Sequence, residues 1–415
     1  MRINAGDTAW VLMSAALVMF MTPGLALFYG GMVRAKNVLA MLMQNFICLG
    51  IVAMLWAVCM YTLAFHGTGK WIGNFDLAFL DHANTTAATG FGGLPIPPLS
   101  FSTFQLMFAI ITPALITGAI ADRMRFSAWF SFVVLWSLIV YTPVAHWVFS
   151  PAGWLFRRGA LDFAGGTVVH INAGIAALVA VLVLGRRRGW PSHPTPPHSL
   201  PLTLLGTGIL WFGWFGFNAG SALGANGVAA QAFINTTFAA SAAMLGWLLF
   251  ERIRGKHATT LGAASGAVAG LVAITPCAGF VGPMASIAIG FIAGAICYFA
   301  VSVKFKFGYD DALDVVGVHL VGGLIGSLLL GLFADRAFNP AVVHQGVFVN
   351  GSWELMGDQL VAVVATLVWS GVLTFVILKV LHLVVPGGLR VSEEDEQLGL
   401  DLTQHSEVGY SYDRV

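Results

Sequence analysis

Long runs of residues without Lys, Arg, Asp or Glu alternate along this chain with short polar segments. The longest of these uncharged, mostly apolar runs are Trp10–Val33, Asn37–Gly69, Phe126–Phe156, Phe163–Gly185, Gly189–Phe250 and His257–Val303. Because a helix needs about 20 apolar residues to cross a bilayer, each of the last two runs is long enough for two helices. We place the breaks at Asn218–Gly227 and Thr275–Pro283, where residues that favour turns interrupt the runs.

Three further apolar segments, Phe101–Ala121, Val315–Phe333 and Gln359–Leu383, bring the expected number of transmembrane helices to eleven. The composition supports an all-α polytopic membrane protein: 58% of the residues are apolar and only 9% are charged, against about 25% charged residues in soluble domains. Such a chain cannot hide its apolar surface in a soluble core and needs lipid as its solvent.

The basic residues predict the orientation. Alternate loops and the C-terminal tail hold 15 of the 20 Lys and Arg residues, and the positive-inside bias therefore places the N-terminus outside and the C-terminus inside. An odd number of helices agrees with this orientation. The first apolar run follows Met1 almost directly, without a small-residue cleavage site, so no signal peptide is expected.

Two histidines lie deep within predicted helices, and both occur in the same local pattern. The pattern is Asp162-x7-His170-x3-Gly174 in the first half and Asp311-x7-His319-x3-Gly323 in the second. Ionisable side chains at bilayer depth are costly and usually line a polar path, and two matching copies indicate an inverted repeat. The expected organisation is a first five-helix repeat (1–185), a cytoplasmic linker (186–200), a second five-helix repeat (201–335), an outer loop with the eleventh helix (336–385) and a cytoplasmic tail (386–415).

Plainer interpretations of these residues stay open. A histidine within a helix can be a core residue bonded to a carbonyl, although the repeated pattern favours a pore role. Asp162 and Asp311 each precede a helical segment and suit helix N-caps, and Asp314 is expected to be structural. The four cysteines show no CxxC spacing, so no metal site and no redox pair is predicted.

Aromatic residues gather near the predicted outer face. Topology places there Phe104, Phe108, Trp147, Phe149, Trp214, Phe217 and the hydroxyl of Ser221. As a bare pattern, this cluster fits the interfacial aromatic belt of any membrane protein. The alternative is a cation–π cage closed by one hydroxyl, which suits a small ammonium-like cation.

Several long stretches of the chain resemble the Amt/Mep/Rh ammonium transporter family, on its Amt side. They are Ala26–Asn37, Leu161–Asn172, Trp214–Ser221, Asp314–His319 and Gly388–Glu394, in the order of the family and spread over essentially the whole chain. Stretches of this length are much more specific than a short motif. Eleven helices with an external N-terminus is also the arrangement of this family, which agrees with the independent inference from charge.

The resemblance implies roles for the matching residues. Phe108 and Phe217 match the stacked pair that closes the pore, and Ser221 matches the hydroxyl of the outer recruitment site, walled by Trp147 and the residue at 149. Trp214 matches a pore-lining aromatic, His170 and His319 the twin histidines of the channel, and Asp162 the acidic residue that supports the outer site. The family usually has Trp where this chain has Phe149, which is a weaker cation–π partner and lacks an indole N–H.

The expected function is ammonium or ammonia transport for nitrogen uptake by a multi-pass cell-membrane protein without cofactors. Alternatives are an ammonium sensor with slow transport and a neutral channel for ammonia or carbon dioxide. An enzyme is not expected, since HExxH is missing and Ala263–Gly266 lacks the first glycine of a GxSG motif. The resemblance further implies a homotrimer and a regulatory tail that includes Thr403, a position phosphorylated in some relatives. It also implies that a PII-type signalling protein docks at the cytoplasmic face.

Overall fold

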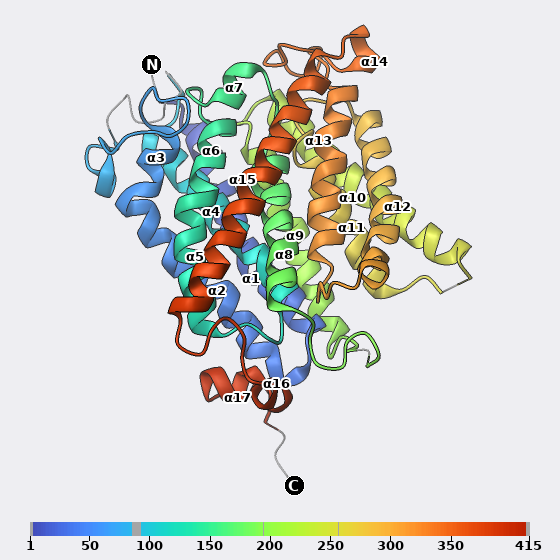
Figure 1. The fold of residues 1–415 in the computed structure, drawn as a ribbon. Coiled ribbons are helices and arrows are strands. Elements are labelled where there is room, and N and C mark those ends of the chain that lie inside the picture. The colour runs from blue at the N-terminus through green and yellow to red at the C-terminus, as the bar shows by residue number, and fades with distance from the viewer. Residues whose placement is uncertain (1–2, 85–92, 194, 256, 412–415) are drawn as a thin grey trace.

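The regular elements of the described chain are helices (Figure 1). The computed structural model describes residues 3–84, 93–193, 195–255 and 257–411. Its longer helices are α1 (Ala5–Met32), α2 (Val38–Leu55), α4 (Pro98–Ile120), α5 (Phe126–Trp136), α8 (Asn172–Leu184), α9 (Leu200–Gly220), α10 (Gly227–Ile253), α11 (Thr260–Ile274), α12 (Pro283–Phe307), α13 (Val321–Phe333) and α15 (Glu354–Val384). The shorter ones are α3 (Tyr61–Phe65), α6 (Thr142–Phe149), α7 (Trp154–Arg158), α14 (Val347–Asn350), α16 (Glu393–Leu398) and α17 (Leu400–His405), with 3₁₀ turns at Ala35–Asn37 and Ala78–Leu80.

Segments of π-helix interrupt or open several of the long helical stretches. The segments η2 (Trp56–Met60) and η4 (Ser137–Tyr141) join α2 to α3 and α5 to α6. The segments η5 (Gly166–Ile171) and η6 (Val316–Leu320) lead directly into α8 and α13. Because π-helical segments are rare and are found mostly at functional sites, η5 and η6 draw attention to the two histidines that they contain.

The predicted multi-pass helical membrane protein is confirmed. In the described residues, ten helical stretches are long and apolar enough to cross a membrane, and α11 is a shorter apolar helix of 15 residues. The two predicted breaks are also correct: α9 ends at Gly220 before α10 begins at Gly227, and α11 ends at Ile274 before α12 begins at Pro283. The four cysteines are free thiols, and three of them, Cys48, Cys277 and Cys297, are buried.

The described chain begins at one end of the bundle, and α16 and α17 lie at the other, which we call the N-terminal end and the tail end (Figure 1). Basic loops predicted to share a side do meet at the tail end. Arg125 Nε donates to the Arg390 carbonyl at 2.8 Å, and the Arg188 N–H donates to Glu396 at 2.7 Å. The tail is thus bonded to loops from distant parts of the chain.

Close backbone approach between helices explains many of the glycines. A Cβ added at Gly206 of α9 would lie 2.2 Å from the backbone nitrogen of Phe28 in α1. At Gly290 of α12 it would lie 2.2 Å from the carbonyl oxygen of Ala239 in α10. Small residues permit such contacts, and van der Waals packing of this kind holds helices together in lipid, where burial of apolar surface contributes little.

A buried ion pair fixes the linker between the two halves. Arg187 donates to Asp310 from its backbone N–H at 2.7 Å, from Nε at 2.9 Å and from Nη2 at 2.8 Å. Burial by itself raises the pKa of the Asp310 carboxyl, but the bonds and charges of Arg187 and Arg123 outweigh it and hold this pKa below its ordinary value. The pair anchors the linker next to Asp311, which caps the segment that carries His319.

Candidate functional site

Each of the two aspartates in the repeated pattern caps the π-helical segment that carries its histidine. Asp162 accepts hydrogen bonds from four backbone N–H groups, those of residues 165–168, at 2.7–3.2 Å. Asp311 accepts from Val315 at 3.1 Å and from Val316 at 2.7 Å. Both carboxylates satisfy donors that a helix start leaves unpaired, so the N-cap interpretation holds for both and the segments are fixed in place.

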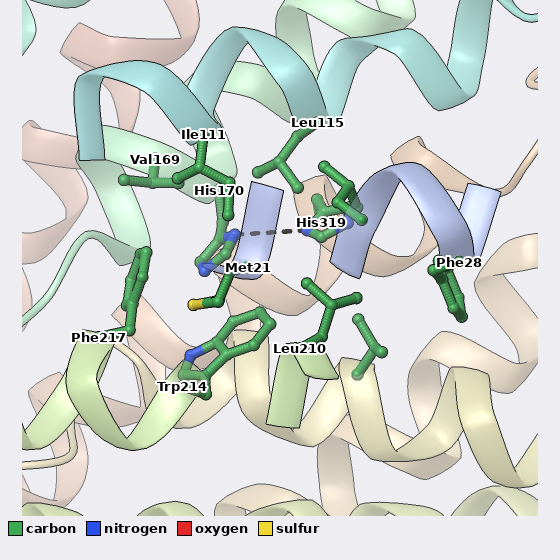
Figure 2. Close-up of a pocket in the computed structure, with 12 residues that line it drawn as sticks. Met21, Phe28, Ile111, Leu115, Val169, His170, Leu210, Trp214, Phe217 and His319 are labelled. Atoms are coloured by element: carbon green, nitrogen blue, oxygen red, sulfur yellow. Dashed lines mark hydrogen bonds between the residues drawn. The ribbon is translucent and has the colours of Figure 1, made fainter. Parts of the chain in front are cut away.

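The two histidines, which the chain separates by 149 positions, are both buried and lie side by side (Figure 2). His170 Nδ1 lies 3.3 Å from His319 Nδ1, and the rings are nearly parallel, with centroids 5.4 Å apart. Only one of the two facing nitrogens can carry the shared hydrogen when both rings are neutral. One ring then presents an acceptor Nε2 and the other a donor Nε2–H. His170 Nε2 has no hydrogen-bond partner among the described residues.

The histidines line a narrow enclosed lumen whose other walls are apolar. Its cavity volume is only about 10 Å³, and its lining residues are Met21, Leu25, Phe28, Ile111, Leu115, Val169, His170, Leu210, Trp214, Phe217, Val268 and His319. The Trp214 ring stacks over His170 at 5.6 Å, and its indole N–H donates to Thr275 at 2.9 Å. Figure 2 shows the lumen running from Phe217 past the two imidazoles to Phe28.

Two phenylalanine rings close the lumen at its N-terminal end. The rings of Phe108 and Phe217 lie 4.3 Å apart with an interplanar angle of 37°, and each side chain is 1% exposed. Phe217 is also 6.1 Å from the His170 ring. Because no water-sized path separates rings at this distance, a solute passes only when a ring moves.

Beyond these rings lies a wider hollow that opens at the N-terminal end, with about 1140 Å³ of empty space including its mouth. Phe108, Phe149, Asp162 and Ser221 line it, together with Gln105, Phe163, Asn226, Phe280 and Asn339 among others. The Ser221 hydroxyl donates to the Phe217 carbonyl at 2.8 Å, so its oxygen keeps lone pairs for a donor in the hollow. The hollow thus combines aromatic faces with oxygen acceptors, which suits a small cation.

Of the residues expected at the outer site, Trp214 and Phe217 line the lumen instead, and Trp147 and Phe104 line neither the hollow nor the lumen. Trp147 packs in a cluster with Trp71, Trp154 and Trp369, and its indole N–H donates to the Trp71 carbonyl at 2.7 Å. Positions 147 and 149 of one helix point to different faces, so Phe149 lines the hollow while Trp147 faces away. Phe104 is buried behind Phe108, with ring centroids 4.9 Å apart.

Sequence reasoning passed over Gln105, whose side-chain oxygen is buried at the hollow without a partner among the described residues. An amide one turn before the gate ring, in an otherwise apolar segment, was the available signal. It also passed over a small cavity of about 10 Å³ at the tail end of the lumen. This cavity shares Phe28, Val268 and His319 with the lumen and adds Ser265 and Asp314.

Comparisons with known proteins agree along the whole chain. Residues 9–410 match the Ammonium Transporter Family. The ammonium transporter of Bacillus subtilis is 51% identical, covering 98% of this chain and 99% of its own length, and that of Mycobacterium tuberculosis is 50% identical, covering 99% and 91%.

Solved structures give the same result. The crystal structure of Candida albicans Mep2 has a TM-score of 0.89 at 34% identity, covering 99% of this chain and 91% of that one. A sensor Amt protein has a TM-score of 0.86 at 30% identity, covering 96% and 98%. The chain therefore belongs to the ammonium transporter family.

Proposed function

We propose that this protein carries ammonium nitrogen across the cell membrane for nitrogen uptake, with the tail end in the cytoplasm. The observation that carries the proposal is that the outer hollow, the phenylalanine pair and the lumen follow one another. A hollow with aromatic faces and free oxygen acceptors leads to a closed phenylalanine pair, and behind the pair two imidazoles lie in an apolar lumen. The relatives named as ammonium transporters support the choice of substrate.

In this mechanism ammonium is recruited in the hollow by the Phe108 and Phe149 faces and the Ser221 oxygen, with Asp162 holding the adjacent segment. A bare cation is costly to move into an apolar lumen, whereas neutral ammonia avoids most of that cost. Ammonium therefore gives up its proton before ammonia passes Phe217. The proton goes either to a water molecule of the open hollow or to the His170–His319 pair, which then passes it on separately, and only the second route carries charge across the membrane. Potassium has a similar size but no proton to lose, so the selection is chemical.

His170 and His319 supply the polar groups that the apolar lumen otherwise lacks. The free Nε2 of His170 accepts from ammonia, and the shared hydrogen between the Nδ1 atoms couples the two rings. We therefore treat the rings as one titrating unit rather than two independent groups. Trp214 closes the lumen wall beside them and keeps ammonia near the imidazoles.

The experiment that tests transport is solid-supported-membrane electrophysiology on reconstituted protein, with an ammonium pulse and a potassium pulse as the control. A transient current for ammonium alone supports electrogenic transport with this selectivity. Silence to ammonium, with ammonia flux still visible as a change of internal pH, supports a neutral channel instead. Equal currents for both cations would contradict the proposed chemistry.

A sensor is the second candidate, because one similar structure is of a sensor Amt protein. A sensor binds ammonium in the hollow but passes it slowly. It would show ammonium-dependent stabilisation of the purified protein without a matching flux into vesicles. Measuring both quantities on the same preparation separates the two functions.

The family resemblance extends the proposal to the assembly and its regulation. The protein is expected to form a homotrimer with one lumen per subunit, built from two inverted five-helix halves. The tail, in which the Thr403 hydroxyl donates to the Gly399 carbonyl at 3.0 Å, is expected to regulate transport and to meet a PII-type signalling protein. Native mass spectrometry of the purified protein, alone and with PII-type protein, tests both expectations.

A further inference from the structure

One aspartate lines each end of the lumen, but among the described residues only the one at the tail end is ion-paired with a lysine. At the N-terminal end, the residues found to line the hollow include Asp162 and neither Lys nor Arg. At the tail end, the residues that line the small cavity beside His319 include Asp314, Ser265 and Phe28. We call this cavity the inner cavity.

Asp314 is held by a lysine from a different helix. Lys304, near the end of α12, places its ammonium nitrogen 2.6 Å from Asp314 Oδ1 and also donates to the Asp311 carbonyl at 2.8 Å. The lysine side chain is only 10% exposed, whereas the Asp314 side chain is 31% exposed and Asp314 belongs to the residues that line the cavity. The buried partner therefore neutralises the accessible one.

The other charged side chains near the Lys304–Asp314 pair already have hydrogen-bond or ion-pair partners. Asp311 caps η6, and Asp310 is bonded to Arg187 and lies 3.7 Å from Arg123. Without Lys304, the Asp314 carboxylate would face the inner cavity with no neutralising partner at hydrogen-bond distance among the described residues. A carboxylate, a hydroxyl and an aromatic face next to one another are the groups that attract a small cation.

We propose that Lys304 is a specificity-determining residue that keeps the cytoplasmic mouth of the pore from binding cations. By neutralising Asp314, it lets ammonium that re-forms at the inner cavity leave, and it denies cytoplasmic cations a site beside His319. The N-terminal hollow, which lacks such a lysine, recruits cations, so the pair contributes to the difference in affinity between the two faces. This inference rests on the proposed transport function.

The test measures ¹⁵N-ammonium flux in right-side-out and inside-out membrane vesicles, with orientation verified by protease access to the tail. Lys304→Met is expected to lower the half-saturating ammonium concentration at the tail face about three- to fivefold, the size of a partly exposed charge interaction. Asp314→Asn is expected to raise it, because the lysine charge is then uncompensated. The value at the N-terminal face should stay unchanged in both variants.

Two controls separate charge from structure. Lys306→Met removes the same charge from the same helix at an exposed position and should leave both faces unchanged. The double variant Lys304→Met with Asp314→Asn removes both charges and should return the tail-face value towards wild type. A structural role alone would not move the two single variants in opposite directions.

Shifts of the same sign in both single variants, or no shift at the tail face in folded protein, would overturn the proposal. If Lys304→Met does not fold, Asp314→Asn decides alone: a raised tail-face value supports the proposal and an unchanged one refutes it. Absence of flux in wild-type vesicles of either orientation would instead refute the transport function, so the two failures are distinguishable.

Discussion

Gly174 lies so close to Leu320 that a Cβ added to the glycine would sit 2.5 Å from the Leu320 backbone nitrogen and 2.6 Å from its Cα. The contact has a counterpart. A Cβ added to Gly323 would sit 3.0 Å from Ile171 and 3.1 Å from the His170 Cβ. Gly174 thus packs against Leu320, the residue after His319, and Gly323 packs against His170 and Ile171. The two close contacts together set the distance between the imidazole rings.

Gly174→Ala is expected to destabilise the protein and to reduce ammonium flux, because backbone atoms of Leu320 cannot yield as a flexible side chain would. Overpacking of this kind costs about 1–3 kcal/mol. Thermal unfolding of the purified variant and flux into vesicles measure the two effects. Gly50→Ala is the matched control, since a Cβ at Gly50 meets nothing within 4 Å. Equal melting temperatures for the two variants would contradict the close contact.

Replacing either His170 or His319 with Ala is expected to lower the ammonium-evoked current on the order of tenfold or more, a loss typical of a removed proton-transfer group. The reason is that the remaining ring loses its Nδ1 partner. His382→Ala, at an exposed position near the end of α15, should keep the wild-type current. An unchanged current in the His170 or His319 variant would refute the coupled pair.

The helices were predictable from the sequence because, in lipid, the chain must satisfy the hydrogen bonds of its own backbone N–H and C=O groups. Uncharged runs bounded by Gly and Pro located the helices, and the breaks before α10 and α12 fell where expected. The π-helical segments were not predictable. They depend on how the caps at Asp162 and Asp311 position each segment against the other half of the chain. A local sequence pattern holds no information about that packing.

The site was predictable where residues carry their own signal, as His170 and His319 do by being ionisable within apolar helices. Residues whose role depends on which way they face were harder. From the sequence, Trp147 looked equivalent to Phe149, yet its direction on the helix places its ring against other tryptophans instead of in the hollow. The roles of Gln105 and of the Lys304–Asp314 pair become visible only once the cavities beside them are known.

Gln105→Met is expected to raise the half-saturating ammonium concentration about five- to tenfold while the maximal rate changes little. The variant keeps the volume of the side chain but removes its buried oxygen, which has no partner among the described residues and belongs to a residue lining the hollow. The expected loss corresponds to one hydrogen bond of about 1–1.5 kcal/mol. Concentration series of ammonium-evoked current measure it. Thr103→Val, an isosteric change two residues away on an exposed face of α4, should behave as wild type.

Phe149→Trp is expected to strengthen ammonium recruitment about two- to fivefold, since indole is the better cation–π partner. The hollow is wide enough to accept the larger ring, and the Phe108 ring lies 6.5 Å from that of Phe149. The same concentration series measures the change, with Phe149→Leu as the opposite control, which should weaken recruitment. An unchanged or lower affinity in the Trp variant would exclude Phe149 from the recruitment wall.

Arg187→Met is expected to destabilise the protein by about 3 kcal/mol near neutral pH, because it leaves the buried Asp310 carboxylate without its main partner. In the wild type the pKa of Asp310 is lowered, so its contribution to stability is present above the unfolded pKa and is lost as pH falls through the folded one. In the variant burial dominates and raises that pKa, so protonation relieves the unpaired charge as pH falls.

The melting-temperature deficit of Arg187→Met should therefore narrow between about pH 7.5 and pH 5, on either side of the pKa expected for a buried carboxyl. Arg186→Met is the matched control, because Arg186 is exposed, donates to the Gly308 carbonyl at 2.8 Å and forms no ion pair with the described residues. It should show a small deficit that does not vary with pH. A deficit of Arg187→Met that stays constant over this range would mean that Asp310 remains ionised without Arg187, with Arg123 at 3.7 Å as its sufficient partner.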